Sequence, residues 1–473
     1  MDKIRTCLLW FSLTAVHTFL FYGHNTGINA LIFSVMVVGL TTWYHGLYRE
    51  KFWRMAVTGH LIIAVSAAWH STFGIAAVYN LTFVVLAGYV FSARSSLLVA
   101  FANGVYGTVL LGFLRTIANG YKLFRDEVSQ RRSFVWSFKK IPLYVAPITV
   151  TAIFYMLYRA ANPDFFLEIN LPDWELDFGL INYTLFGAII ICPLFFSRGL
   201  KNLTERDLEE PDLLSRIRRK SNPGKPIGLI YENMQGVIMF SMLNLLIVVF
   251  LIFNIFQVFL PSLNHSPAGY SQQVHQGFET LVISVVVAIL LIMFYFRGNQ
   301  NFYVRKGKLV SLAVIWIALN GILILFTCYK NTLYITSFGL TYKRIWVFIG
   351  MFLTTIGLYL TLVKIYKLKT NWYLIRQNTW VMYFAISSYC LVDWDRLITW
   401  YNPNYAEFLD IGYLLSLDET KLPYLKELLK DNDPRMEPYK AEILQKIANV
   451  NLPFAWQDET FDKIWLREQL KNQ

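Results

Sequence analysis

Long runs of apolar residues without a charged side chain recur along this chain, separated by short polar segments. The runs at 238–260 and 281–296, for example, contain no Asp, Glu, Lys or Arg. A helix needs roughly 20 mostly apolar residues to cross the hydrocarbon core of a bilayer. Only helices and closed barrels can cross, because lipid offers no hydrogen bonds to a bare backbone. The runs do not alternate strictly between apolar and polar residues, so the pattern favours helices. We therefore expect an all-α polytopic membrane helical bundle.

About twelve membrane-spanning helices fit this pattern. Their approximate limits are 6–22, 27–45, 52–70, 73–92, 96–116, 141–159, 179–197, 236–260, 275–295, 309–328, 345–364 and 379–395. No signal-peptidase pattern is convincing, so we expect the first segment to be an uncleaved span. The chain then divides into N-terminal spans with a basic loop (1–140), a C-terminal bundle (141–395) and an extramembrane helical tail (396–473).

The charges between the spans orient the bundle. Basic residues crowd the loops at 115–140, 198–231, 297–308 and 364–378, whereas segment 160–178 holds five Asp or Glu and no Lys or Arg. An excess of Lys and Arg marks cytoplasmic loops. We therefore expect these basic loops to be cytoplasmic and the C-terminal tail to be extracytoplasmic.

The amino-terminal end does not fit this orientation when twelve spans are counted. It would place Met1 outside, although Lys3, Arg5 and the segment 49–54 are basic. The later loops carry more positive charge, so we give their orientation more weight. An error of one span among the first five would remove the conflict.

The composition supports the same class of protein. Only 16% of the 473 residues are charged, with a net charge of +12, whereas soluble domains carry about a quarter charged residues. Basic residues in short loops suit anionic lipid head groups, which we expect as partners at the cytoplasmic loops. We expect no nucleic-acid partner. The four cysteines form no CxxC pair, so we expect no disulfide framework, no metal site and no cofactor.

The tail at 396–473 is the only sizeable part outside the spans. Apolar residues recur there at helical spacing, and prolines interrupt them at Pro403, Pro423, Pro434 and Pro453. We expect a small cap of three or four short helices, with Trp456 and Trp465 as packing anchors. So small a unit is expected to lean on the bundle or on the membrane surface for stability.

Ionisable residues near the outer ends of the last spans form our candidate outer polar cluster. Its members are His275, Glu279, Lys343, Arg344, Asp393, Asp395 and Arg396. Tyr270, Tyr342 and Trp394 could wall a site among them. A carboxylate beside a histidine could relay protons, bind a cation or act as a general base. The alternative is that these charges end their helices at head-group level and neutralise one another.

A second candidate lies at the inner side, where Glu232 enters one span and Arg297 leaves the next. We expect these two residues to pair. His17 and His60 lie within spans, where helix–helix hydrogen bonds are the simpler explanation. The chain contains no Walker A, GxSxG or dinucleotide-binding motif, so the sequence leaves open whether the protein is an enzyme.

Several segments of the C-terminal half are similar to one known family. They are Glu232 with the apolar run that follows it, 274–278 (VHQGF), 297–303 (RGNQNFY), 339–348 (GLTYKRIWVF) and 394–402 (WDRLITWYN). The chain resembles an uncharacterised bacterial family of multi-pass membrane proteins known only as a domain of unknown function. The resemblance implies a many-helix protein of the bacterial cytoplasmic (inner) membrane and implies no activity.

Three functions remain open at this point. The first is a transport or sensing protein with an outward-facing polar pocket, which would respond to a ligand by changing conformation. The second is a membrane scaffold or assembly protein, which would tolerate changes in the pocket. The third is a membrane-embedded transferase acting on a lipid-linked or envelope substrate, for which His275 and Glu279 are the candidate catalytic residues.

Overall fold

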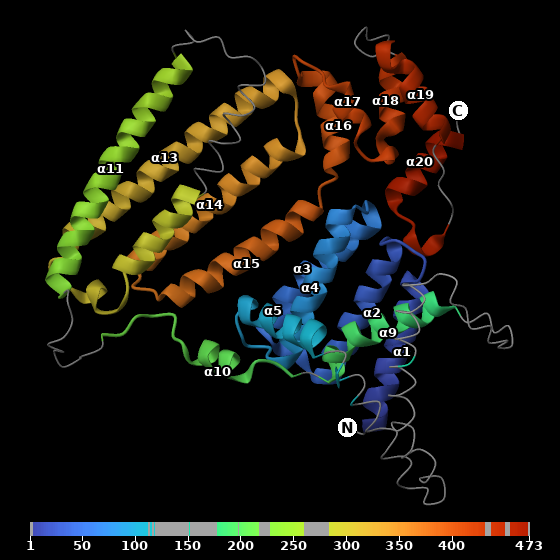
Figure 1. Ribbon diagram of the computed structural model, residues 1–473, viewed down its shortest axis with the longest axis horizontal. Coiled ribbons are helices and arrows are strands. Elements are labelled where there is room, and N and C mark those ends of the chain that lie inside the picture. Colours follow the sequence, from blue (N-terminus) through green and yellow to red (C-terminus); the bar gives the residue numbers. More distant parts are fainter. Residues whose placement is uncertain are drawn as a thin grey trace, which may run out of the picture.

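The computed structural model describes residues 3–111, 114–115, 118, 151, 177–196, 198–216, 228–259, 283–430, 437–449 and 455–471. These residues are mostly helical and form no strand, which confirms the expected all-α polytopic bundle (Figure 1). Eight of the described helices are long and apolar enough to span a membrane. They are α1 (Lys3–Phe21), α2 (Ile28–His45), α3 (Lys51–Trp69), α4 (Phe73–Phe91), α9 (Phe178–Phe195), α11 (Leu229–Phe259), α13 (Gly307–Phe338) and α14 (Tyr342–Tyr366).

Each of these eight helices coincides with an expected span. The expected span at 141–159 lies outside the described residues, and the span at 275–295 is described only as a shorter apolar helix, Ile283–Tyr295. The last expected span, 379–395, corresponds to α15 (Asn371–Cys390), which begins earlier and is not among the eight.

The first helices pack into one apolar core. Helices α1 to α4 and α9 surround it together with α5 (Leu97–Val105), and its members include Trp10, Phe33, Trp53 and Ile191. Helices α4 and α5 approach closely because Gly88 and Gly104 have no side chain. A Cβ atom on Gly88 would overlap the carbonyl of Ala100, and one on Gly104 would overlap the carbonyl of Val84. Small residues permit such close helix contacts in membranes.

The expected span at 96–116 is wrong as a membrane crossing. Helix α5 ends at Val105 and continues only as a π-helical turn to Leu110. At its start, the Ser96 amide donates to Asp207 Oδ2 (2.5 Å). Near its other end, Arg115 Nη1 donates to the carbonyl of Arg198 (3.4 Å). Both contacts are made to the segment 198–207, so Ser96 and Arg115 lie at the same end of the bundle.

This correction resolves the conflict over the amino-terminal charges. The start of α1 and the link between α2 and α3 now lie at the same end of the bundle as α10 (Lys201–Glu209). Glu50 pairs there with Arg94 (3.2 Å), and Lys369 forms an isolated bridge with Leu213. The basic segments therefore gather at one end, which we call the basic end.

A second core forms between α11, the helix Ile283–Tyr295, α13 and α14. Its buried residues include Phe240, Ile292, Trp316 and Met351. Helix α15 lies between the two cores: Trp380 and Tyr383 belong to the first core, while α15 also packs along α14. The Tyr383 hydroxyl donates to the carbonyl of Ala56 on α3 (2.6 Å). The two bundles are thus joined along α15.

The tail forms a helical cap at the end of the bundle opposite the basic end (Figure 1). It contains α16 (Trp394–Tyr405), α17 (Ile411–Leu415), α18 (Leu422–Lys430), α19 (Lys440–Asn449) and α20 (Phe461–Lys471). Its core leans on the bundle as expected, since Ile345 of α14 packs with Ile398, Leu414 and Leu425.

The two expected anchor tryptophans differ in their surroundings. Trp465 stacks on Tyr424 with ring centroids 4.9 Å apart. Trp456 remains partly exposed and lies near Phe19 of α1. Close by, the Glu459 carbonyl accepts a hydrogen bond from the Ile28 amide (2.9 Å). The cap therefore contacts both bundles.

We expect Gly88→Ala to lower the melting temperature of the purified chain. The added methyl meets the Ala100 carbonyl, and such overpacking costs about 1–3 kcal/mol. The matched control is Gly39→Ala on α2, where an added Cβ meets no atom within 4 Å and alanine favours the helix. Equal melting temperatures for the two variants would contradict the close α4–α5 contact.

Candidate functional site

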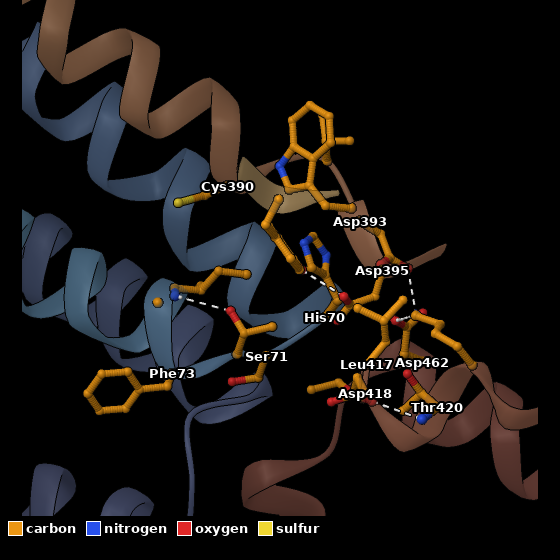
Figure 2. Close-up of a pocket in the computed structure, with 18 of the residues that line it drawn as sticks. His70, Ser71, Phe73, Cys390, Asp393, Asp395, Leu417, Asp418, Thr420 and Asp462 are labelled. Atoms are coloured by element: carbon orange, nitrogen blue, oxygen red, sulfur yellow. Dashed lines mark hydrogen bonds and ion pairs between the residues drawn. The ribbon is translucent and has the colours of Figure 1, made fainter. Parts of the chain in front are cut away.

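A cavity lies where both bundles meet the cap. Its volume is about 970 Å³, within the range of ligand sites in proteins. Its walls come from the α3–α4 turn, the start of α14, the end of α15 and the cap (Figure 2). We call this space the junction cavity. Because helix ends supply most of its polar side chains, these groups lie outside the apolar middle of the spans.

Lys421 of the cap is the central charge of the cavity. Its Nζ lies 2.6 Å from Asp393 Oδ2 and 2.6 Å from Asp462 Oδ2, and its side chain is only 5% exposed. Asp393 also caps α16 by accepting a hydrogen bond from the Arg396 amide (3.0 Å). The lysine therefore fastens the start of α16 to α20.

Sharing one lysine between two buried carboxylates moves their pKa values apart. For Asp393, burial acts to raise the pKa, but the ion pair with Lys421 outweighs it and lowers the pKa below its usual value. For Asp462, burial dominates and raises the pKa. Burial opposes the charge of Lys421 as well, yet its two carboxylate partners raise the pKa of the ammonium group. The cluster thus holds a cation tightly between two unlike carboxyl groups.

His70 ends α3 at the edge of this cluster. It is only 7% exposed, and its Nδ1 atom is buried without a hydrogen-bond partner. Burial lowers the pKa of His70, while the charges of Asp393 and Asp462 act in the opposite direction. The ring is therefore neutral near neutral pH, and it presents a nitrogen that has no partner among the described residues.

Asp395 is the second buried carboxylate of α16. It is 7% exposed, and its Oδ1 accepts a hydrogen bond from the Tyr342 hydroxyl (2.8 Å). Burial raises the pKa of Asp395, and the hydrogen bond from Tyr342 only partly offsets this effect. Among the described residues, no cation lies within ion-pair distance of Asp395. An unpaired buried carboxylate is costly and is therefore a candidate functional group.

Only some residues of the expected outer cluster lie at the junction cavity. Asp393 and Asp395 line the cavity. Arg344 is buried beneath it, where Nη1 donates to the carbonyl of Phe338 (2.7 Å) and the guanidinium lies over the Tyr334 ring. Lys343 is exposed, and Arg396 lies 5.6 Å from the centroid of the Tyr424 ring.

The remaining expected residues divide between the undescribed part and the basic end. His275, Glu279 and Tyr270 lie outside the described residues. Arg297 Nη2 lies 3.6 Å from Glu232 Oε1, as expected for the inner pair. This pair is partly exposed, and Arg297 lines a recess with Asp207 and Trp372 at the basic end, so the structure separates the two candidate sites.

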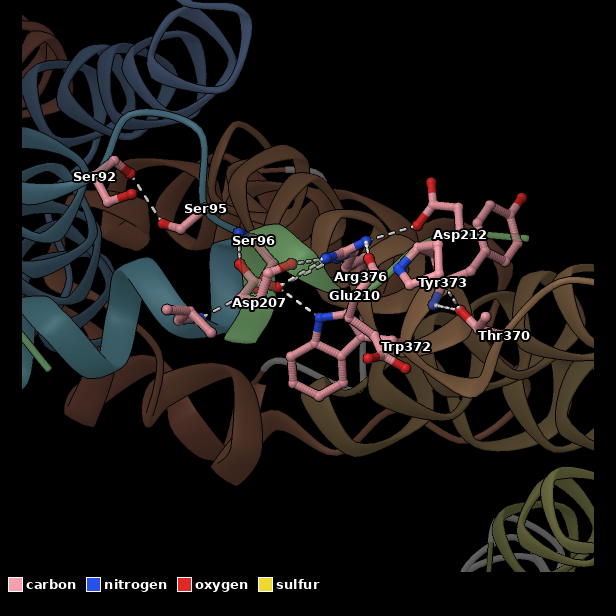
Figure 3. A network of polar contacts seen from close by, with 12 residues as sticks. Ser92, Ser95, Ser96, Asp207, Glu210, Asp212, Thr370, Trp372, Tyr373 and Arg376 are labelled. Atoms are coloured by element: carbon pink, nitrogen blue, oxygen red, sulfur yellow. Dashed lines mark hydrogen bonds and ion pairs between the residues drawn. The ribbon is translucent and has the colours of Figure 1, made fainter. Parts of the chain in front are cut away.

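A denser network fixes the basic end, as Figure 3 shows. Asp207 of α10 is 1% exposed at its side chain and accepts hydrogen bonds from Trp372 Nε1 (2.5 Å) and the Ser96 amide (2.5 Å). Arg376 joins it at 3.2 Å and also pairs with Asp212 (2.7 Å). All strong donors here are satisfied, so we assign this network to holding α10, α5 and α15 together.

Among the ionisable residues that line the cavity, sequence reasoning missed His70, Lys421 and Asp462. His70 ends a span, which is the same signal that selected Asp393 and Asp395. The other two lie in the tail, where charged residues are normally solvated. The described residues contain no group of three or more His, Cys, Asp or Glu arranged to hold a metal ion.

We expect Lys421→Met to destabilise the cap by about 3 kcal/mol at neutral pH, since it leaves Asp393 and Asp462 buried without a cation. In the wild type, the lowered pKa of Asp393 contributes stability that is lost as the pH falls through that pKa. In the variant the sign reverses, because unpaired buried carboxyls take up protons more readily when folded. Lowering the pH toward about 5 should therefore recover part of the lost stability.

Thermal unfolding of the full chain at several pH values measures this effect. The control is Lys440→Met, whose partner Glu437 is largely exposed, and it should leave stability nearly unchanged. A loss for Lys421→Met that grows on acidification would contradict the buried triad.

Comparison with known proteins agrees with the resemblance drawn from the sequence. No curated protein and no solved structure matches the chain. A family model does match, over residues 10–428, and this range includes most of α1, the described helices from α2 to α17, most of α18 and the cavity residues on α16. The chain therefore belongs to the family described as a domain of unknown function, DUF4153.

Proposed function

We propose that this membrane protein binds a ligand in the junction cavity and converts binding into a movement of its two bundles, as a transporter or a sensor does. The observation that carries the proposal is the position of the cavity. It is bounded by the α3–α4 turn and α4 of the first bundle, by α14 of the second, and by the cap. A ligand that touches all three would favour one relative arrangement of them.

The chemistry of the cavity supports ligand binding rather than packing alone. Buried ionisable groups cost free energy unless they are paired, and they mark functional sites in membrane proteins. Asp395 has no ion-pair partner among the described residues, and His70 Nδ1 has no hydrogen-bond partner. A protein that served only as a scaffold would gain stability from apolar residues at both positions.

The position of the basic end indicates which side of the membrane the cavity faces. Arg297, Lys308, Lys364 and Lys369 belong to segments at that end, opposite the cap. Because Lys and Arg are retained on the cytoplasmic side, we place the basic end in the cytoplasm, against anionic lipid head groups, and the cavity and cap on the outer side of an inner membrane.

We expect filling the cavity to abolish the response to any ligand, whatever its charge. Ser71→Trp adds an indole at the cavity wall. Spin labels at Leu81 of α4 and Phe352 of α14, both exposed, report the separation of the bundles. A screen of mixed charged and neutral small molecules should find compounds that change this separation in the wild type and not in Ser71→Trp.

The control for the added indole is Thr58→Trp, at an exposed position on α3 away from the cavity, which should keep the response. If no compound changes the separation, and Ser71→Trp also complements a deletion strain fully, the scaffold function replaces this proposal.

The orientation makes a separate prediction for labelling in intact cells. Glu407→Cys in the cap should react with a membrane-impermeant maleimide, because the residue is exposed at the outer end. Arg305→Cys, exposed at the basic end, should react only after the membrane is permeabilised. The opposite pattern would place the cap in the cytoplasm and make soluble proteins the partners to seek.

A further inference from the structure

The charges lining the junction cavity are unbalanced. Five carboxylates line it, against two lysines. Both lysines are already paired: Lys421 with Asp393 and Asp462, and Lys463 with Asp458 (3.5 Å). The cavity therefore presents excess negative charge to anything that enters, which favours a cation and repels an anion.

Asp395 is the carboxylate best placed to meet that cation. It is buried at the start of α16, and its side-chain hydrogen bond comes from a neutral hydroxyl, that of Tyr342. Asp393 two residues earlier already has its lysine. A charge taken out of water is stabilised only by an opposite charge or by several hydrogen bonds, and a cationic ligand would supply the missing charge.

Aromatic rings line the same space. Trp346, Tyr389 and Trp394 form a continuous row along the wall, with ring centroids 4.7 Å apart for the first pair and 5.2 Å for the second. The faces of such rings attract a cation that has lost its water, and they also cover the apolar body of a ligand. A bare metal ion would leave these rings unused.

From these contacts we propose that the ligand of the junction cavity is an organic cation, a positively charged nitrogen on an apolar or aromatic body. The nitrogen pairs with Asp395, and the body lies against Trp346, Tyr389 and Trp394. His70, neutral at the edge of the cavity, accepts or donates a hydrogen bond through Nδ1. This inference rests on the proposed function and adds the chemical class of the ligand.

The test uses three probes of similar size: benzyltrimethylammonium, benzyl alcohol and benzenesulfonate. Binding to the purified full-length protein is measured by titration calorimetry. We expect saturable binding of the cation only. Asp395→Asn keeps the size of the side chain and an acceptor for Tyr342 but removes the charge, so it should weaken binding at least about tenfold.

Two further variants keep the test decisive. Trp346→Leu, at a partly exposed ring, should also weaken binding and guards against misfolding of the Asp395→Asn protein. Glu407→Gln removes a negative charge from the same end of the molecule outside the cavity and should leave affinity unchanged.

The outcomes separate this inference from the function on which it rests. Equal affinity of the cation for the wild type and Asp395→Asn overturns the inference, as does no saturable binding up to about 10 mM, beyond ordinary ligand affinities. Tighter binding of the neutral or anionic probe, weakened by Trp346→Leu, also overturns the ligand class but leaves ligand binding in the cavity standing. If no ligand changes the separation of the bundles of the wild type in the spin-label experiment, the proposed function itself is overturned.

Discussion

The structure depends on helix α15 lying between two apolar cores. Trp380 and Tyr383 pack into the first core, and the neighbouring face packs along α14 of the second. The contact with α3 requires Gly59, because a Cβ there would overlap the Tyr383 ring. With both faces covered by protein, α15 can carry polar residues at membrane depth that a lipid-facing helix could not carry.

The same helix connects the two polar regions. Its first turns carry Trp372 and Arg376, which bind Asp207 at the basic end. Its last turns carry Tyr389 and Cys390, which line the junction cavity. A helix of this length is stiff, so a tilt at one end displaces the other. Helix α15 therefore connects the cavity to α10 through one continuous element.

The sequence predicts the long apolar helices well. It predicts less well the helices that are surrounded by other parts of the protein instead of lipid. Each of the eight long apolar helices was expected, because about 20 apolar residues have few other uses. The stretch 96–116 is also apolar, but α5 ends at Val105, and Gly88 and Gly104 let it lie close against α4. Hydropathy measures preference for an apolar environment and says nothing about how deep a segment goes. For α15 the expected span began too late, at residue 379, because Asn371, Arg376 and Asn378 are polar. These residues belong to the helix because protein covers them.

Only part of the candidate site could be predicted from the sequence, for a related reason. Asp393 and Asp395 could be found because a charge at the end of a span is costly and conspicuous. Lys421 and Asp462 lie in the amphipathic tail, where charged residues are normally solvated. Only the folded cap reveals that Lys421 pairs with both Asp393 and Asp462. Pairings between residues so far apart in the chain depend on tertiary packing, which periodicity and composition do not encode.

The two aspartates at the start of α16 connect the cluster of Lys421, Asp393 and Asp462 with the ligand site of the cavity. Asp393 has a lysine, and that pair fixes the cap over the ends of α3 and α15. Asp395, two residues later, has only a tyrosine hydroxyl. If both carboxylates had cations, the excess negative charge of the cavity would be smaller. The structure instead satisfies the carboxylate that holds the cap and leaves the adjacent one short of a charge, so the cost of burying Asp395 is recovered only when a cation enters.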